Sequence, residues 1–135
     1  MEAGVPPGVF NVVTGLGPEA GQALAEHMDV DKIAFTGSTP TGRKIIEAAK
    51  GNMKKVALEL GGKSPSVVMA DAEMDMAIPG AANAIFFNGG QVCVAGSRLY
   101  VEKKAFDNVV AGIADIAKGM QMGHGLEQTL SLIHI

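Results

Sequence analysis

Cys93 is the single cysteine of the sequence and its strongest candidate nucleophile. It lies in a segment of small residues, 88–98, where glycine and alanine allow a backbone to approach a substrate closely. Free N–H groups in such a loop can stabilise an oxyanion, as the addition of a thiolate to a carbonyl carbon requires. A free cysteine is more often a small buried apolar side chain, so both interpretations stay open at this point.

Glu59 offers a candidate base at the carboxyl end of a predicted strand, residues 54–60. In open α/β sheets, ligands bind at that end of the strands. Apolar neighbours would raise the pKa of this carboxyl group towards that of a useful general base. The structural alternative is a surface glutamate that pairs with Lys54, Lys55 or Lys63.

The turn over residues 35–42 lies between a predicted strand and the start of a predicted helix. Exposed N–H groups and the positive end of the helix dipole bind phosphate and other anions there. No Lys-Ser or Lys-Thr pair follows Gly42, so the turn is not the P-loop of nucleoside triphosphate enzymes. It also departs from the G-x-G-x-x-G dinucleotide turn, and its glycines have a purely conformational explanation as well.

Other catalytic constellations are not predicted. The three histidines, His27, His124 and His134, share no ligand spacing, so we expect no metal. None of them has an orienting partner that would complete a Ser-His-Asp triad. One cysteine also excludes an internal disulfide.

The first sixty residues must position Glu59 and the turn. Apolar runs predict strands, and apolar residues at helical spacing predict the helices between them. We place Thr39 at an N-cap, Pro40 at the first helical position and Gly51 at the helix end. The predicted order is strand 9–13, helix 18–27, strand 32–36, helix 40–50 and strand 54–60. Such an alternation predicts an α/β fold with a parallel sheet.

A composition break, Gly-Gly-Lys-Ser-Pro over residues 61–65, is the candidate domain boundary. The acidic residues of 71–75 predict the start of a helix that runs to Phe87, provided that Pro79 lies in its first turn. The other predicted elements are a strand over 66–70, a strand over 98–102 and a helix over 106–117. The apolar tail 130–135 has no predicted partner.

Composition excludes several classes of protein. The 135 residues carry 11 Lys+Arg against 14 Asp+Glu, with 4% aromatic residues, so we expect no nucleic-acid partner. The most apolar stretch, 76–87, is shorter than the roughly twenty residues of a membrane span, and no secretory signal is evident, so we expect a cytoplasmic protein. Apolar faces without a partner element predict a chain less stable than its size suggests.

Three blocks of sequence together resemble the aldehyde dehydrogenase superfamily. They are Phe-Thr-Gly-Ser-Thr at 35–39, Leu-Glu-Leu-Gly-Gly-Lys-Ser-Pro at 58–65, and the segment 86–98 with Gly-Gln-Val-Cys at 90–93. The blocks stand in the family's order, and Glu59 and Cys93 are separated as in the family. The resemblance covers residues 2 to 129 and implies a piece of a longer NAD(P)-dependent enzyme. Residues 1–61 would be the C-terminal part of a Rossmann-like dinucleotide-binding domain, 62–129 the start of an α/β catalytic domain, and 130–135 a non-native tail.

The resemblance implies a role for each candidate residue. Cys93 would be the nucleophile that forms a thiohemiacetal and then a thioester, and its N–H an oxyanion donor. Glu59 would be the base that activates the hydrolytic water. The implied cofactor is NAD or NADP, with an aldehyde as the substrate. The residues expected near the pyrophosphate are Gly37, Ser38 and Gly42, and those expected near the nicotinamide are Thr36, Leu60 and Gly61.

Some features depart from the family or lie outside these residues. Gly89 stands where a glutamine is usual. The second oxyanion donor, the ribose-binding residues and the oligomerisation segment are not among the 135 residues, so we expect this chain alone neither to turn over aldehyde nor to bind NAD tightly. The parent protein is expected to be a homo-oligomer, a dimer or a tetramer. The alternatives are a CoA-acylating relative, which commonly lacks the glutamate, and a catalytically silent structural or binding member of the fold.

Overall fold

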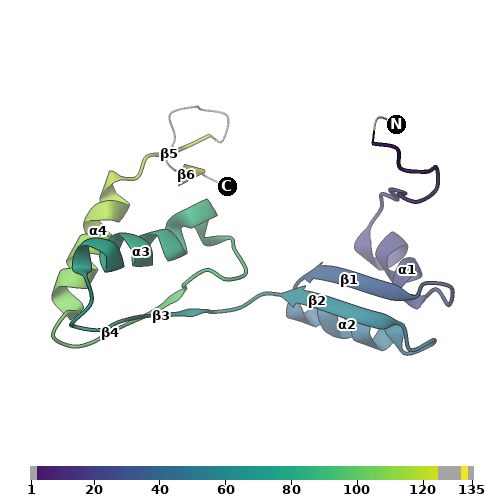
Figure 1. The fold of residues 1–135 in the computed structure, drawn as a ribbon, viewed down its shortest axis with the longest axis horizontal. Helices are drawn as coiled ribbons and strands as arrows, with labels where there is room; N and C mark the ends of the chain where they lie inside the picture. Colours follow the sequence, from purple (N-terminus) through teal and green to yellow (C-terminus); the bar gives the residue numbers. More distant parts are fainter. Residues whose placement is uncertain (1–2, 125–131, 134–135) are drawn as a thin grey trace. The chain divides into compact units, whose positions relative to one another are not determined.

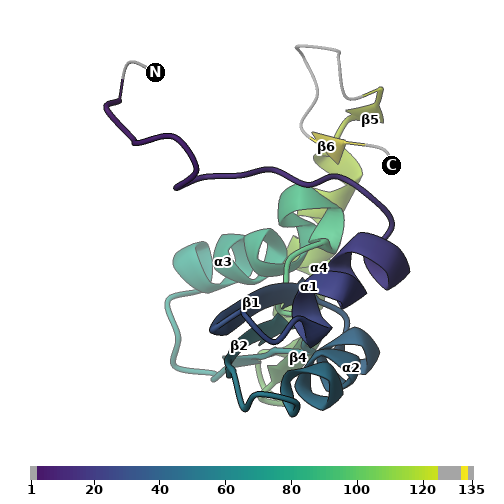
Figure 2. The same ribbon diagram turned by 90° about the vertical axis from the view of Figure 1, so that its right-hand side faces the viewer.

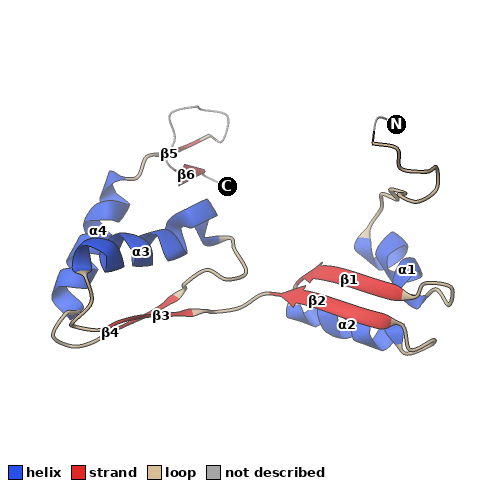
Figure 3. Ribbon diagram, viewed as in Figure 1, coloured by secondary structure: helices blue, strands red, loops and turns tan. Residues whose placement is uncertain are grey.

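A computed structural model describes residues 3–124 and 132–133 of the chain, which divides into two compact units. Unit 1 is Met1–Leu60 and unit 2 is Gly61–Ile135, so the division lies beside the predicted composition break. Each unit contains a pair of parallel strands with helices packed on it (Figures 1 and 3). The predicted α/β class with parallel strands is therefore confirmed, and the assignment of cofactor and catalytic domains to the units stays a prediction.

Unit 1 is built around two parallel strands. Its elements are a π-helical turn (Gly17–Gly21), α1 (Gln22–Glu26), β1 (Lys32–Gly37), α2 (Thr39–Ala49) and β2 (Lys55–Leu60). Residues of β1 and β2 pair in one register, from Lys32 opposite Lys55 to Gly37 opposite Leu60. Helix α2 packs against both strands, and α1 packs against α2 (Figure 2). The predicted helices and the last two predicted strands of this unit are thus confirmed.

The two faces of β2 differ as its alternating sequence predicts. Val56, Leu58 and Leu60 are half-buried, whereas Ala57 and Glu59 are exposed. Gly42 of α2 is buried on the side of the leucines, because a Cβ atom there would lie 2.8 Å from Leu60 Cδ2. The bare glycine backbone therefore lets α2 lie close to β2.

Two predictions for unit 1 are wrong. Residues 9–13 form no strand but lie in a loop (Figure 3), with side chains such as Phe10 79% exposed. An apolar run does not form a strand without a partner backbone, and within the described chain no segment pairs with this one. The N-cap of α2 is Ser38, not Thr39, since the Thr41 N–H donates to Ser38 Oγ at 3.3 Å.

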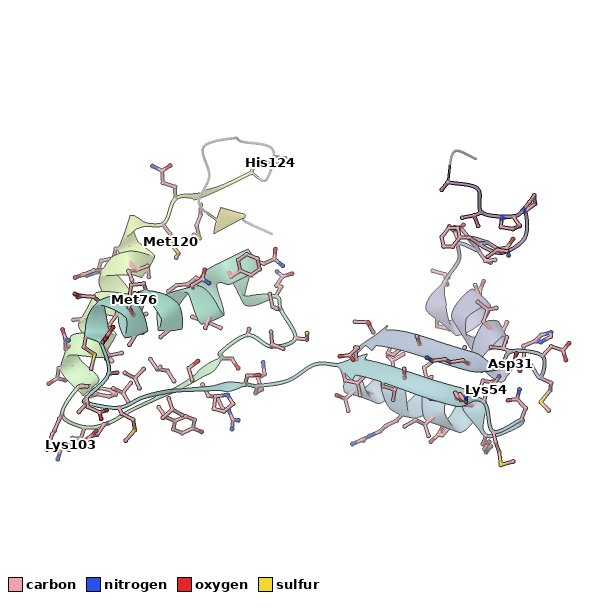
Figure 4. The ribbon with its side chains drawn as sticks, viewed as in Figure 1. Asp31, Lys54, Met76, Lys103, Met120 and His124 are labelled. Atoms are coloured by element: carbon pink, nitrogen blue, oxygen red, sulfur yellow. The ribbon has the colours of Figure 1, made fainter. Side chains whose placement is uncertain are left out.

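Lys54 ties the end of α1 to the start of β2 and is only 7% exposed. Its ammonium group donates to the carbonyl oxygen of Ala25 at 2.6 Å and to that of His27 at 2.7 Å. A cation is favoured there because the last carbonyl groups of a helix have no partner within the helix. In Figure 4, Lys54 lies near Asp31, whose carbonyl accepts from the Lys55 N–H.

Unit 2 also contains a strand, helix, strand, helix order. Its elements are β3 (Pro65–Val68), α3 (Met74–Phe86), a 3-10 turn (Phe87–Gly90), β4 (Arg98–Val101), α4 (Phe106–Gly119), β5 (Met122–Gly123) and β6 (Leu132–Ile133). β3 pairs with β4 in parallel, and Val68 of β3, Ala105 and Val109 of α4 form the buried core, against which Met74, Ala77 and Ile78 of α3 pack. Gly112 of α4 packs on Ile78 of α3, because a Cβ at Gly112 would lie 2.8 Å from Ile78 Cγ2.

Two expectations for unit 2 are corrected. Pro79 is the sixth residue of α3 rather than part of its first turn. Pro79 has no N–H for the carbonyl of Asp75, but both residues are exposed, so water can bind that carbonyl. The tail does have a partner, since Leu132 and Ile133 pair in parallel with Met122 and Gly123. The rest of 130–135 lies outside the described residues, and its non-native origin stays a prediction.

The end of α3 is followed by three successive residues in the left-handed region. The φ angles are 52° at Asn88, 63° at Gly89 and 74° at Gly90. Glycine adopts this region without the penalty that a Cβ brings. A side chain at Gly90 would also place its Cβ 3.0 Å from the carbonyl oxygen of Ile85.

None of the helices within the described part of the chain is both long enough and apolar enough to cross a membrane.

We predict that Lys54→Met destabilises unit 1 by about 1–3 kcal/mol, because it leaves two helix-end carbonyls without their donor. Lys55→Met, the matched control on an exposed neighbour, is expected to change stability by less than about 0.5 kcal/mol. Urea unfolding followed by circular dichroism measures both. Equal losses for the two variants would contradict a specific role for the Lys54 bonds.

We predict that Gly90→Ala destabilises unit 2 by about 1–2 kcal/mol through its positive φ and the contact with Ile85. Gly80→Ala is the control, because Gly80 lies inside α3 and a methyl group added there would meet no neighbouring atom. That change is expected to stabilise the unit by up to about 1 kcal/mol. Thermal and urea unfolding of the two variants should shift in opposite directions; a shift in the same direction would refute the conformational argument.

Candidate functional site

Cys93 lies in the segment that joins the 3-10 turn to β4. The segment is fixed at its far end, where the Gly96 N–H donates to the Ala84 carbonyl of α3 at 2.9 Å. A side chain at Gly96 would collide with Ser66 Oγ of β3, so the small residue is needed for this close packing. The Ala95 N–H also donates to the Val92 carbonyl at 3.0 Å, which closes a tight turn around Cys93.

Cys93 is exposed in this chain, so the alternative of a small buried apolar side chain does not hold here. Within residues 3–124 and 132–133, no group accepts a hydrogen bond from the Cys93 N–H. Its carbonyl oxygen faces Gly62, where a Cβ would lie 3.2 Å from it. The cysteine therefore combines an accessible sulfur with a free backbone donor, which is the combination that addition to a carbonyl needs.

Glu59 lies at the carboxyl end of β2, opposite Thr36 of β1. Both side chains are exposed, so unit 1 does not surround the carboxylate with the apolar neighbours that we expected. Within unit 1, the alternative of a surface ion pair with Lys54 or Lys55 does not form either. Glu59 is thus a free carboxylate beside Thr36 at the strand ends, where ligands bind in α/β sheets.

The turn before α2 offers few free donors. Pro40 has no N–H, and the Thr41 N–H already donates to Ser38 Oγ at 3.3 Å. The Gly42 N–H donates to the Ser38 carbonyl at 2.9 Å, so it is also used. The N–H groups of Ser38 and Thr39 donate to no described residue and remain at the positive end of α2.

The structure brings together the predicted site residues of unit 1. Because β1 and β2 are parallel and in register, the carboxyl ends of both strands meet at one edge. That edge carries Thr36, Gly37, Ser38, Glu59 and Leu60. Gly42 is buried behind it, and Gly61 and Cys93 belong to unit 2. A surface hollow lined by Asp31, Lys32, Asn52, Met53, Lys54 and Lys55 lies at the opposite ends of these strands, away from the candidate site.

Sequence reasoning gave no role to Arg98, which follows the cysteine segment. Its Nε–H donates to the Lys63 carbonyl at 2.8 Å, and its backbone N–H to the Ser64 carbonyl at 3.3 Å. The available signal was an arginine at the first position of a strand, directly after a segment of small residues. The described residues contain no cluster of three or more His, Cys, Asp or Glu side chains that could hold a metal ion.

Comparison with known sequences places this chain among related proteins. The family model described as the aldehyde dehydrogenase family matches residues 1–132. "Aldehyde dehydrogenase 9" of Polyandrocarpa misakiensis is 52% identical over 132 residues, which cover 94% of this chain and 58% of that protein. "Aldehyde dehydrogenase 1A1" of Rattus norvegicus is 52% identical over 131 residues, which cover 96% of this chain and 26% of that protein.

Solved structures give the same result. A crystal structure of PnpE in complex with nicotinamide adenine dinucleotide has a TM-score of 0.93 and 51% identity, covering 97% of this chain and 27% of that one. An NAD⁺ complex of aldehyde dehydrogenase from Bacillus cereus has a TM-score of 0.94 and 46% identity, again over 97% and 27%. The chain spans less than two thirds of each of these relatives. The chain belongs to the aldehyde dehydrogenase family.

Proposed function

We propose that the protein containing this segment oxidises an aldehyde to a carboxylic acid with NAD⁺ or NADP⁺. The observation that carries the proposal is the exposed Cys93 thiol with an unused N–H beside it. Its relatives support the reaction class, because they are aldehyde dehydrogenases and some were solved with NAD⁺.

The residues at the edge of unit 1 fit a dinucleotide. Ser38 and Thr39 have free N–H groups at the positive end of α2, which suits a pyrophosphate next to Gly37. We assign Thr36, Leu60 and Gly61 to the nicotinamide end, where a side chain at Gly61 would meet no neighbour. A nicotinamide bound there would supply the acceptor for a hydride that leaves the cysteine adduct.

Gly42 requires a different assignment. It is buried against Leu60 and its N–H is already bonded to Ser38. We therefore assign it an indirect role, in which the bare glycine lets α2 approach β2 and keeps Ser38 at the edge. The expectation that Gly42 lies near the pyrophosphate stays a prediction, with which this indirect role is compatible.

Cys93 carries the first half of the proposed mechanism. Its thiolate adds to the aldehyde carbon, so a C–S bond forms and the π electrons of the carbonyl move to oxygen. The Cys93 N–H donates to that oxyanion. It is available to do so because it makes no hydrogen bond to another described group. Departure of the hydride from the same carbon leaves a thioester on the sulfur.

Glu59 carries the second half. Its free carboxylate takes a proton from a water molecule, and the water oxygen adds to the thioester carbon. The C–S bond then breaks, which releases the carboxylic acid and restores the thiolate. The absence of an ion pair between Glu59 and a described residue of unit 1 supports this role, because the carboxylate is available to accept the proton. A CoA-acylating enzyme would use a thiol in place of this water.

The remaining assignments concern the whole protein. A small-molecule aldehyde is the substrate, and the homo-oligomer, dimer or tetramer, stays a prediction. A cytoplasmic location is supported by the name of a relative that is 51% identical over 131 residues, "Aldehyde dehydrogenase, cytosolic 1" of Mus musculus.

In the full-length protein, we predict that Cys93→Ala lowers NADH formation by about 10³-fold or more, because no covalent adduct forms. Glu59→Gln is expected to lower steady-state turnover by about 10²-fold or more. This variant should still release a burst of NADH, since the amide blocks only hydrolysis of the thioester. Rapid-mixing absorbance measurements separate the burst from the steady state.

Glu47→Gln is the control for the loss of a carboxylate, because Glu47 is exposed on α2 and outside the site. It is expected to leave both phases unchanged. A Cys93→Ala enzyme with normal turnover would refute the covalent mechanism. Loss of the burst in Glu59→Gln would refute a role confined to hydrolysis, and wild-type release of acyl-CoA in place of acid would favour the CoA-acylating alternative.

The 135-residue chain alone is expected to form no NADH from aldehyde above background. The relatives solved with NAD⁺ are much longer, with 27% of their chains covered here, and the rest of such a chain would complete the site. The chain purified alone, mixed with NAD⁺ and a panel of aliphatic and aromatic aldehydes, tests this by absorbance. Turnover close to that of the full-length enzyme would contradict the prediction.

A further inference from the structure

We propose that Arg98 is a positioning residue for Cys93, and that it acts through the backbone of residues 62–64. The inference rests on the proposed function of Cys93 as the nucleophile. All the residues concerned belong to unit 2. No described contact joins Arg98 to the sulfur. Its bonds go to Lys63 and Ser64, which directly follow Gly62, the residue that faces the Cys93 carbonyl oxygen.

Arg98 binds two successive carbonyl groups of this segment. The side-chain Nε–H donates to Lys63 O at 2.8 Å, and the backbone N–H donates to Ser64 O at 3.3 Å. The backbone bond continues the pairing of β3 with β4, in which Pro65 lies opposite Arg98. The side-chain bond extends the contact one residue further towards Gly62, beyond the end of the strand pair.

Gly62 transmits this constraint to the cysteine. A Cβ on Gly62 would lie 3.2 Å from the carbonyl oxygen of Cys93, so the two backbones are in close approach. No hydrogen bond links Gly62 to Cys93 among the described residues. The approach therefore depends on whatever fixes Lys63 and Ser64, and Arg98 supplies both of the described bonds to their carbonyl groups.

Three substitutions of Arg98 separate the contribution of its Nε–H hydrogen bond from that of its charge. In Arg98→Gln, the amide nitrogen takes the position of Nε along the side chain, so a donor remains and the charge is lost. In Arg98→Met, a methyl carbon takes that position, so the length is kept without donor or charge. In Arg98→Lys, the charge remains but a methylene replaces the donor.

The experiment uses the full-length enzyme and two readouts. The first is the rate at which iodoacetamide alkylates Cys93 in the absence of substrate, measured by mass spectrometry of the peptide that contains it. The second is the rate of the NADH burst at saturating cofactor. We expect Arg98→Met and Arg98→Lys to change alkylation by about threefold or more and to slow the burst by about tenfold, because small displacements of a reacting group are costly.

Arg98→Gln is expected to keep both rates within about twofold of the wild type, since the donor at the Nε position is retained. Arg43→Met is the control for loss of an arginine, because Arg43 is exposed on α2 and its side chain makes no hydrogen bond to a described residue. Circular dichroism at the assay temperature establishes that each variant is folded. Hydrogen exchange at the backbone amide of residue 98 reports whether its bond to the Ser64 carbonyl remains in each variant.

The outcomes separate this inference from the proposed function. Unchanged alkylation and burst rates in folded Arg98→Met would overturn the positioning role while leaving the function intact. Equal defects in Arg98→Gln and Arg98→Met would overturn the role of the hydrogen bond. If the wild-type enzyme forms no NADH, the proposed function fails, and the alkylation rates still decide whether Arg98 positions Cys93.

Discussion

Parallel pairing of β1 with β2 is the constraint on which the arrangement of unit 1 depends. Two parallel strands must be joined by a crossover, here α2, and a parallel pair brings both carboxyl ends to one edge. The register places Thr36 beside Glu59 and Gly37 beside Leu60, so the proposed base and the turn proposed to bind the cofactor meet at one edge of the strand pair. Gly42 maintains the same arrangement from behind, because α2 can approach Leu60 only where no Cβ intervenes.

Short-range sequence patterns predicted most of the elements, because the causes of those elements are local. The alternation from Val56 to Leu60 fixes which face of β2 is covered, and this holds in the structure. Local patterns gave wrong predictions where strand formation depends on a partner that is distant in the sequence. Residues 9–13 are as apolar as a buried strand, yet without a neighbouring backbone they form none. Ser38 and Thr39 are both good N-caps, and only the geometry of the turn selects Ser38.

The candidate site also has features that the sequence predicts and features that only the structure shows. Cys93 and Glu59 were predicted from residue type, spacing and a family resemblance, and the family is confirmed. The exposure of Cys93 and its free N–H depend on how the chain packs, so a sequence pattern does not predict them. The bonds from Arg98 to residues 63 and 64 depend on strand register, which was not predicted for β3 and β4. The family was therefore more predictable from the sequence than the contacts within the candidate site.

The left-handed stretch at Asn88, Gly89 and Gly90 gives this part of the chain a local preference for the opposite chirality. At a positive φ, the side chain of a D-amino acid occupies the position that is favourable for an L-residue at the corresponding negative φ. A D-alanine at position 89 would thus carry no backbone penalty at the φ of 63°, and it would lose the freedom of glycine in the unfolded state. The φ angles of the backbone just before the cysteine accordingly favour glycine or a D-residue over most L-residues.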